Sequence, residues 1–99
     1  MCSFVVFSSN ELNFSYLSNA LKKLKHRGPD NNYAAIENHL SWGFNRLSIM
    51  DLSSNGNQPF KYNSCELVCN GEIYNYSSLK ELLSDEYKFH SNSDCEVLI

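Results

Sequence analysis

The sequence contains no long apolar run and no long basic run. No apolar stretch approaches the ~18 residues that a membrane span requires, and no basic run is longer than Lys22-Lys23 in a chain of net charge −3. Clustered Lys and Arg bind nucleic acids and anionic membranes, so neither is an expected partner. The first apolar run, Phe4 to Phe7, is too short for a signal peptide and lacks a positive leading segment. We therefore expect a cytoplasmic protein.

Closely spaced cysteine pairs of the kind that bind zinc are also missing. Cys65 and Cys69 stand four residues apart, and the three histidines are scattered. An even number of cysteines is compatible with disulfides, but cytosolic thiols stay reduced and nothing in the sequence suggests export. We expect no metal, cofactor or disulfide in this chain. We interpret Cys65, Cys69 and Cys95 as buried, small apolar side chains.

Strands and helices are segregated along the chain rather than strictly alternating. A chain of 99 residues forms one domain at most. The order of its elements favours an α+β fold with mainly antiparallel strands. Short apolar and aromatic runs predict strands over residues 3–8, 33–36, 40–49, 65–69, 73–76 and 87–90.

A polar cap and an apolar stripe predict the first helix. Asn13 has the side chain of an N-cap, and apolar residues follow it at every third or fourth position. Gly28-Pro29 cannot continue a helix. The stripe consists of Phe14, Leu17, Leu21 and Leu24.

Two S-x-x-E patterns indicate capping boxes. Ser78 and Glu81 predict a short helix, and Ser93 and Glu96 predict a second one. The second ends at Ile99 after about six residues, and a helix that short is not stable alone. We therefore expect that the chain is a fragment or a truncated product of something longer.

Cys2 is the first residue that could carry chemistry. If Met1 is removed, Cys2 holds both a thiol, whose pKa is near 8.5, and a free α-amine, whose pKa is about 7.7–8.0. The amine can take a proton near neutral pH. Nucleophile and base then come from one residue, as in the N-terminal nucleophile enzymes. The alternative is that a cysteine stands at this position by chance.

The pair Asn70-Gly71 allows two interpretations. Between two strands, Asn-Gly is typical of a type I′ hairpin turn. An amide side chain next to a glycine N–H could also donate hydrogen bonds to a developing oxyanion. The two interpretations are compatible.

Arg46 and Asp94 could hold the two charged groups of a free amino acid. Arg46 lies in an apolar stretch, where it forms either a structural ion pair or a bidentate clamp on a substrate carboxylate. Asp94 lies in the first turn of a predicted helix, where it either complements the helix dipole or pairs with a substrate ammonium. Together with Cys2 and Asn70-Gly71, these groups would suit acyl transfer from an amide side chain.

Six segments of the sequence are similar to segments of one family: MCSFVVF, HRGPD, GFNRLSIMDLS, NQPF, LVCNGEIYNY and SDCEVLI. In this order they resemble the glutaminase domain of glutamine-dependent asparagine synthetases, which are class II (N-terminal nucleophile) glutamine amidotransferases. The resemblance implies that residues 1–99 are the N-terminal part of such a domain. It also implies an α+β fold of the N-terminal-nucleophile hydrolase type, an αββα sandwich of antiparallel sheets that is incomplete at the C-terminus.

The resemblance implies a role for each candidate residue. Cys2 attacks the glutamine side-chain amide to give a glutamyl thioester and ammonia, and the Cys2 α-amine acts as the base. Asn70 and the Gly71 N–H form the oxyanion hole. The implied glutamine-binding residues are Arg46 at the α-carboxylate, Leu47, Ser48, Ile49 and Met50 along the pocket wall, Asn70, Gly71, and Glu72 and Asp94 at the α-amino group.

In the family, a synthetase domain follows the glutaminase domain. It would bring ATP, Mg²⁺ and aspartate, and its signature loop is not in this sequence. The resemblance therefore implies that the ammonia normally passes to an activated aspartate outside these residues, and a separate synthetase-domain chain is a candidate partner. The alternative is a truncated, non-catalytic remnant or a partner-binding domain without activity.

Overall fold

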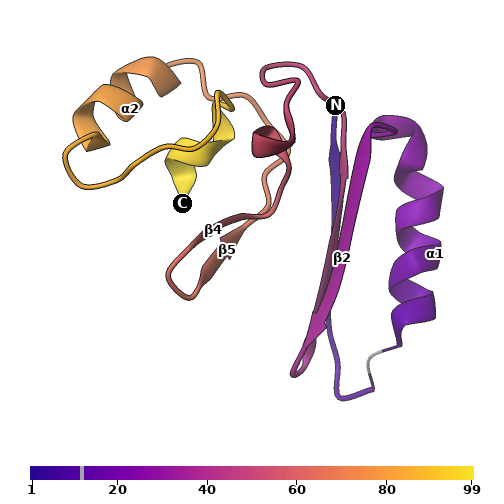
Figure 1. Ribbon diagram of the computed structural model, residues 1–99. Coiled ribbons are helices and arrows are strands. Elements are labelled where there is room, and N and C mark those ends of the chain that lie inside the picture. Colours follow the sequence, from indigo (N-terminus) through magenta and orange to yellow (C-terminus); the bar gives the residue numbers. More distant parts are fainter. Residues whose placement is uncertain (12) are drawn as a thin grey trace. The chain divides into compact units, whose positions relative to one another are not determined.

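The computed structural model describes residues 1–11 and 13–99. The chain divides into two compact units, Met1–Leu47 and Ser48–Ile99. Unit 1 and unit 2 are described separately below. Both contain antiparallel strands and helical segments (Figure 1), which confirms the mixed class of helices and antiparallel sheet that the sequence predicts.

Unit 1 is a three-stranded antiparallel sheet with a helix packed against it (Figure 1). The strand order is β1 (Ser3–Ser8), β3 (Leu40–Arg46) and β2 (Asn31–Glu37), and the helix is α1 (Phe14–Leu24). β1 begins and ends at the residues that the sequence predicts. The central strand, β3, is buried over most of its length because it has a neighbour on both edges.

The cap and the apolar stripe explain where α1 begins and which face it buries. Asn13 Oδ1 accepts a hydrogen bond from the Ser15 N–H (2.8 Å), as an N-cap does. Leu17 and Leu21 are buried, but Phe14 is 56% exposed, so the predicted stripe is wrong at its first position. After α1, a short 3₁₀ turn (Lys25–Arg27) ends at Gly28.

The strand predicted over residues 40–49 is shorter in the structure, because β3 ends at Arg46. The next N–H group, that of Leu47, points to Cys2 Sγ (3.3 Å) instead of a strand neighbour. This early end of the strand brings the Leu47 backbone to the start of β1.

Unit 2 has less regular structure than unit 1. Its sheet is a two-stranded hairpin of β4 (Phe60–Tyr62) and β5 (Cys65–Leu67), and its α-helix is α2 (Tyr76–Leu83). Two 3₁₀ segments complete it, η2 (Ser54–Gly56) and η3 (Cys95–Leu98). The hairpin turns at Asn63, whose φ of 52° is left-handed.

Two predicted strands are wrong. Residues 73–76 and 87–90, all described by the structure, form no strand. The N–H of Ile73 donates to Asp94 Oδ2 (2.6 Å), and the N–H of His90 donates to Glu96 Oε1 (2.9 Å). Backbone groups that a sheet would pair are therefore satisfied by carboxylates.

Both predicted capping boxes are also wrong. α2 begins at Tyr76, so Ser78 lies inside the helix rather than at its cap. The second segment is the 3₁₀ turn η3, preceded by Asp94, and not an α-helix opened by Ser93. The Glu96 carboxylate turns to the backbone before it rather than to the Ser93 N–H, which donates to Ser91 Oγ (3.1 Å).

No helix within residues 1–11 and 13–99 is long and apolar enough to span a bilayer.

Two glycines of unit 1 make a matched stability test. A Cβ at Gly28 would overlap the Asn45 carbonyl and crowd the Arg46 nitrogen, whereas a Cβ at Gly43 would meet the Leu21 Cδ1 methyl at 2.5 Å. Backbone cannot move aside as a side chain can, so we expect Gly28→Ala to cost about 3 kcal/mol or more and Gly43→Ala about 1 kcal/mol. Urea denaturation of both variants measures the difference. Equal costs would contradict this packing.

Candidate functional site

Cys2 lies at the start of β1, against the end of β3. Its Sγ accepts a hydrogen bond from the Leu47 N–H (3.3 Å) and lies 3.6 Å from the Leu47 carbonyl oxygen. These two contacts hold the sulfur beside the Leu47 backbone at the end of β3. The side chain is half-buried, so a substrate could reach it.

Side chains that the sequence analysis did not select hold the Cys2 backbone in place. Arg27 Nε donates to the Cys2 carbonyl oxygen (3.2 Å). The next residue, Ser3, is buried, and its hydroxyl accepts from Asn45 Nδ2 (3.3 Å), which also donates to the Leu21 carbonyl (2.9 Å). Arg27 belongs to the HRGPD motif, but the motif did not indicate that Arg27 binds the Cys2 carbonyl oxygen.

Arg46 stands next to Cys2 at the same end of the sheet. β1 and β3 pair from Ser3 opposite Asn45 onward, so Cys2 and Arg46 each lie one residue beyond that pair. Arg46 is buried and takes part in interactions inside the protein. Unit 1 thus brings together three predicted site residues, namely Cys2, Arg46 and Leu47.

The Asn70-Gly71 segment is not the hairpin turn that the sequence predicts. A type I′ turn requires positive φ at both central residues, and neither Asn70 nor Gly71 has one. Side chains hold this segment instead. Gln58 donates to the Cys69 carbonyl (3.1 Å) and accepts from the Cys69 N–H (2.6 Å). The Gln58 amide therefore replaces a strand partner just before Asn70.

Asp94 lies beside the same segment. It is buried, and its Oδ2 accepts from the Ile73 N–H (2.6 Å), while the Gly71 carbonyl accepts from the Cys95 Sγ (3.5 Å). Unit 2 thus brings together Asn70, Gly71 and Asp94. The Ile73 N–H fixes the position of the Asp94 carboxylate. The helix dipole suggested by the sequence contributes little to stabilising Asp94, because η3 is a single 3₁₀ turn.

The other predicted binding residues are more exposed. Glu72 is exposed beside Gly71, and Ser48 is half-buried at the start of unit 2. Ile49 and Met50, predicted for the pocket wall, are 63% and 48% exposed.

Glu96 is a buried carboxylate of unit 2 with several hydrogen-bond donors. It is 2% exposed, and its carboxylate accepts from the N–H groups of His90 and Ser91 (both 2.9 Å), the Ser91 hydroxyl and the Tyr87 hydroxyl. Burial favours the neutral acid, but the hydrogen bonds from Ser91 and His90 and the charge of Lys80 outweigh it and hold the pKa of Glu96 below its usual value. The carboxylate therefore stays ionised and fixes the backbone that leads to Asp94.

Asp51 also holds the loop of residues 90–92 that Glu96 binds, a role that the sequence did not predict. Its Oδ1 accepts from the Ser53 N–H (2.8 Å) and hydroxyl (2.6 Å), and its Oδ2 accepts from the Asn92 N–H (2.8 Å). The spacing of Asp51 and Ser53 is a recognisable Asx-turn signal. The bond to Asn92 links residues far apart in sequence, so no local pattern reveals it.

The cysteines differ in burial from the prediction. Cys95 is buried, as predicted, but Cys69 is half-buried and Cys65 is exposed. Cys65 lies at the edge of the small hairpin, where it has too few neighbours to be covered. Among residues 1–11 and 13–99, no three His, Cys, Asp or Glu side chains are grouped so that they could hold a metal ion.

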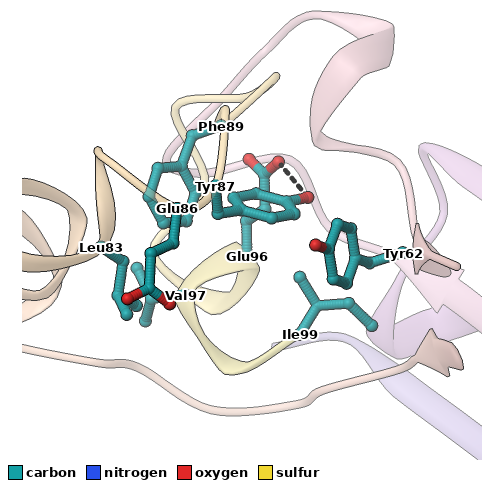
Figure 2. A pocket seen from close by; sticks show the side chains of 8 residues that line it. All are labelled: Tyr62, Leu83, Glu86, Tyr87, Phe89, Glu96, Val97 and Ile99. Carbon is teal, nitrogen blue, oxygen red and sulfur yellow. Dashed lines mark hydrogen bonds between the residues drawn. The ribbon is translucent and has the colours of Figure 1, made fainter.

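A cavity of about 230 Å³ opens in unit 2 (Figure 2). Aromatic rings form one wall, with Tyr87 edge-on to both Tyr62 (5.0 Å between ring centroids) and Phe89 (4.7 Å). Burial and the nearby Glu96 carboxylate raise the pKa of Tyr87. The lining residues are Tyr62, Leu83, Glu86, Tyr87, Phe89, Glu96, Val97 and Ile99. None of them is a predicted glutamine-binding residue, so this cavity is not the candidate site.

The chain is similar to known proteins over nearly its whole length. Residues 1–99 match the family described as glutamine amidotransferase domain. The chain is similar to the amidase chry2 of Gibberella zeae (45% identity, covering 84% of this chain and 13% of that protein). It is also similar to a probable glutamine-hydrolysing asparagine synthetase of Acanthamoeba polyphaga mimivirus (42%, covering 97% and 18%) and to glutamine-hydrolysing asparagine synthetase 1 of Bacillus subtilis (41%, covering 100% and 17%). It spans less than a fifth of each of these relatives.

The Glu96 network predicts a pH effect on stability. Because the pKa of Glu96 is lowered by folding, its contribution is fully present above the unfolded value of about 4.3 and is lost as the pH falls through the folded value. We expect Glu96→Gln to cost ~1–3 kcal/mol near neutral pH. We also expect the variant to lose less stability than the parent on acidification.

Urea denaturation at about pH 7 and at about pH 3, on either side of the Glu pKa range, measures both effects. Glu81→Gln, which changes an exposed glutamate of α2, is the matched control and should follow the parent at both pH values. An acid sensitivity in Glu96→Gln as large as that of the parent would contradict the lowered pKa.

Proposed function

Because this chain belongs to the glutamine amidotransferase domain family, we propose that it carries the glutamine-hydrolysing site of an asparagine-synthetase-like enzyme. The observation that supports this most is the setting of Cys2, whose thiol lies against the Leu47 N–H next to buried Arg46. In this proposal residues 1–99 are the N-terminal part of the glutaminase domain. The substrate is glutamine, and the products are glutamate and ammonia.

The reaction begins at Cys2 once Met1 has been removed. The α-amine takes the thiol proton, and the thiolate attacks the carbonyl carbon of the glutamine side-chain amide. The proton passes to the leaving nitrogen, ammonia departs, and a glutamyl thioester remains. Water then attacks the thioester, which releases glutamate and restores the thiol. The contacts of Sγ with the Leu47 backbone fix the position of the sulfur at the start of each cycle.

We propose that Asn70 and Gly71 form the oxyanion hole. The negative oxygen that develops in each tetrahedral intermediate needs donors that are already in place. The Asn70 side-chain amide and the Gly71 N–H are such donors. The Gln58 bonds to Cys69 and the Cys95 bond to the Gly71 carbonyl restrain the backbone on both sides of Asn70.

We propose that Arg46 binds the α-carboxylate of glutamine and that Asp94 binds its α-ammonium group. A guanidinium binds a carboxylate through two parallel hydrogen bonds, which suits the α-carboxylate. Asp94 accepts from the Ile73 N–H through one carboxylate oxygen. In this proposal the Asp94 carboxylate and Glu72, which precedes Ile73, face the α-ammonium group. Leu47, Ser48, Ile49 and Met50 complete the pocket wall.

The fold of the complete domain is part of the proposal. On the face of the unit 1 sheet opposite α1, Phe4, Val6 and Leu40 are 46%, 48% and 43% exposed. On the same face, within the described residues, the buried Trp42 Nε1 has no hydrogen-bond partner. An apolar sheet face with an unsatisfied donor favours a covering layer. We propose that a second antiparallel sheet packs there, as in an αββα sandwich.

The similarity to asparagine synthetases supports a proposal for the fate of the ammonia. We propose that it passes to an aspartate activated with ATP and Mg²⁺ in a synthetase domain, in the same protein or on a separate chain. A catalytic thiol must stay reduced, so we assign the reaction to the cytoplasm.

The nucleophile is tested by Cys2→Ala. We expect it to reduce glutamate release from glutamine to the uncatalysed background, because no other group replaces the thiol. Enzymatic assay of glutamate measures this, with Cys65→Ala, at an exposed cysteine, as the control that should keep full activity. Glutamate release from Cys2→Ala at the parent rate would exclude the thioester route. If the parent also releases no glutamate, the alternative of a non-catalytic remnant stands.

The oxyanion hole is tested by Asn70→Ala. Loss of one preorganised donor should lower kcat about 10²–10³-fold and leave KM nearly unchanged, since the donor acts mainly on the transition state. Asn32→Ala, at an exposed residue of β2, serves as the control. A rise in KM with kcat preserved would instead mean that Asn70 binds the ground state of glutamine.

A further inference from the structure

Two cysteines that take no part in the chemical steps of the proposed mechanism adjoin residues of the candidate site. Cys69 immediately precedes Asn70, and Cys95 immediately follows Asp94. A change at either sulfur would therefore act within one residue of a group that we assign to glutamine.

Both sulfur atoms lie against Gly71. Cys95 Sγ donates to the Gly71 carbonyl oxygen (3.5 Å), and a Cβ built on Gly71 would lie 4.0 Å from Cys69 Sγ. Burial raises the pKa of the Cys95 thiol, and the adjacent Cys69 thiol raises it further. The two sulfur atoms thus lie beside the same residue, Gly71, and we infer that side-chain rotation can bring them into bonding distance.

The segments that carry the two cysteines are joined by hydrogen bonds. The side chain of Gln58 holds both the N–H and the carbonyl of Cys69. Asp94, next to Cys95, holds the Ile73 N–H (2.6 Å). The backbone on both sides is thus fixed in the arrangement that keeps the sulfurs together, which lowers the entropic cost of linking them.

The two cysteines differ in their access to solvent. Cys69 is half-buried and Cys95 is buried. A small oxidant in solution therefore meets Cys69 first, and Cys95 is placed to react second. This order is typical of a reactive cysteine next to a resolving cysteine.

We propose that Cys69 and Cys95 form a reversible disulfide that disables the glutamine site under oxidising conditions. The consequence for activity rests on the proposed function, but the disulfide itself does not. Cytosolic disulfides of this kind are usually transient and redox-sensing.

The oxidant that we propose is a low-molecular-weight disulfide, RSSR. The Cys69 thiolate attacks one sulfur of RSSR, which forms a mixed disulfide and releases RS⁻. Cys95, after losing its proton, attacks the Cys69 sulfur, and the second RS⁻ leaves. Two protein thiols are oxidised, one external disulfide is reduced to two thiols, and the two protons end on the released thiols.

The disulfide would act on the proposed oxyanion hole. It removes the Cys95 S–H that donates to the Gly71 carbonyl, and it turns both sulfurs toward each other across this peptide. Without that bond the Gly71 peptide is no longer held in the position that we assign to the oxyanion. Because Asp94 adjoins Cys95, a shift of the Cys95 backbone also moves the carboxylate proposed for the α-ammonium group.

The first experiment tests whether the disulfide forms. The purified protein is treated with glutathione disulfide, alkylated, and digested with proteases that cleave after Lys and Glu. The digestion places Cys69 (residues 67–72), Cys95 (residues 89–96) and Cys65 on separate peptides. We expect mass spectrometry to find the first two peptides joined. The link should disappear in Cys69→Ser and in Cys95→Ser and remain in Cys65→Ser. Mixed glutathione disulfides alone, or a link that involves Cys65 or Cys2, would overturn the proposal.

The second arm measures activity in Cys65→Ser, with and without the additional Cys69→Ser change. In Cys65→Ser, glutamate release should fall in proportion to the linked fraction and return on reduction with dithiothreitol. The double variant, treated alike, reports any loss through oxidation of Cys2 alone. A linked protein with unchanged glutamate release would overturn the effect on the site. A protein that forms the link but releases no glutamate even when reduced would contradict the proposed function and leave the disulfide intact.

Discussion

Unit 2 depends on buried carboxylates that accept hydrogen bonds from backbone N–H groups. Burying a carboxylate without partners is costly, and several N–H donors make its ionised form stable. Glu96 shows the balance most clearly, because its pKa is lowered despite burial. These bonds hold the loops of unit 2 in place, where the sheet is only the two-stranded hairpin of β4 and β5. The carboxylates and the N–H groups that they accept are Asp51 with Ser53 and Asn92, Asp94 with Ile73, and Glu96 with His90 and Ser91.

The two units hold their candidate residues by different means. In unit 1, the register of β1 and β3 sets Cys2 and Arg46 at one end of the sheet, and packing of α1 supports the strands. In unit 2, Asn70 and Asp94 stand on irregular segments whose geometry comes from side chain–backbone bonds. Irregular backbone leaves N–H groups free of ladder bonds, which is what an oxyanion hole requires. The cost is that single side chains, such as Glu96, become essential to the local structure.

The sequence predicts the regular elements of unit 1 better than the irregular segments of unit 2. β1 and α1 were predictable because a Val- and Phe-rich run, an N-cap and apolar periodicity are local signals. Residues 73–76 and 87–90 also carry strand-forming side chains, but the N–H groups of Ile73 and His90 donate to the carboxylates of Asp94 and Glu96, so the strand predictions were wrong. Glu96 was predicted as a cap because the S-x-x-E spacing does not distinguish a capping box from a buried network. The resemblance to glutamine amidotransferases is confirmed over residues 1–99, whereas the assignment of each site residue stays a prediction.

The central claim is that Cys2 is the nucleophile of an assembled glutamine site. The most direct measurement is intact-mass and N-terminal peptide mass spectrometry of the purified protein after exposure to an electrophilic glutamine analogue. The account predicts a chain without Met1, labelled at Cys2 alone, and protected from the label by excess glutamine. An unlabelled chain, or label spread evenly over Cys2, Cys65, Cys69 and Cys95, would contradict it.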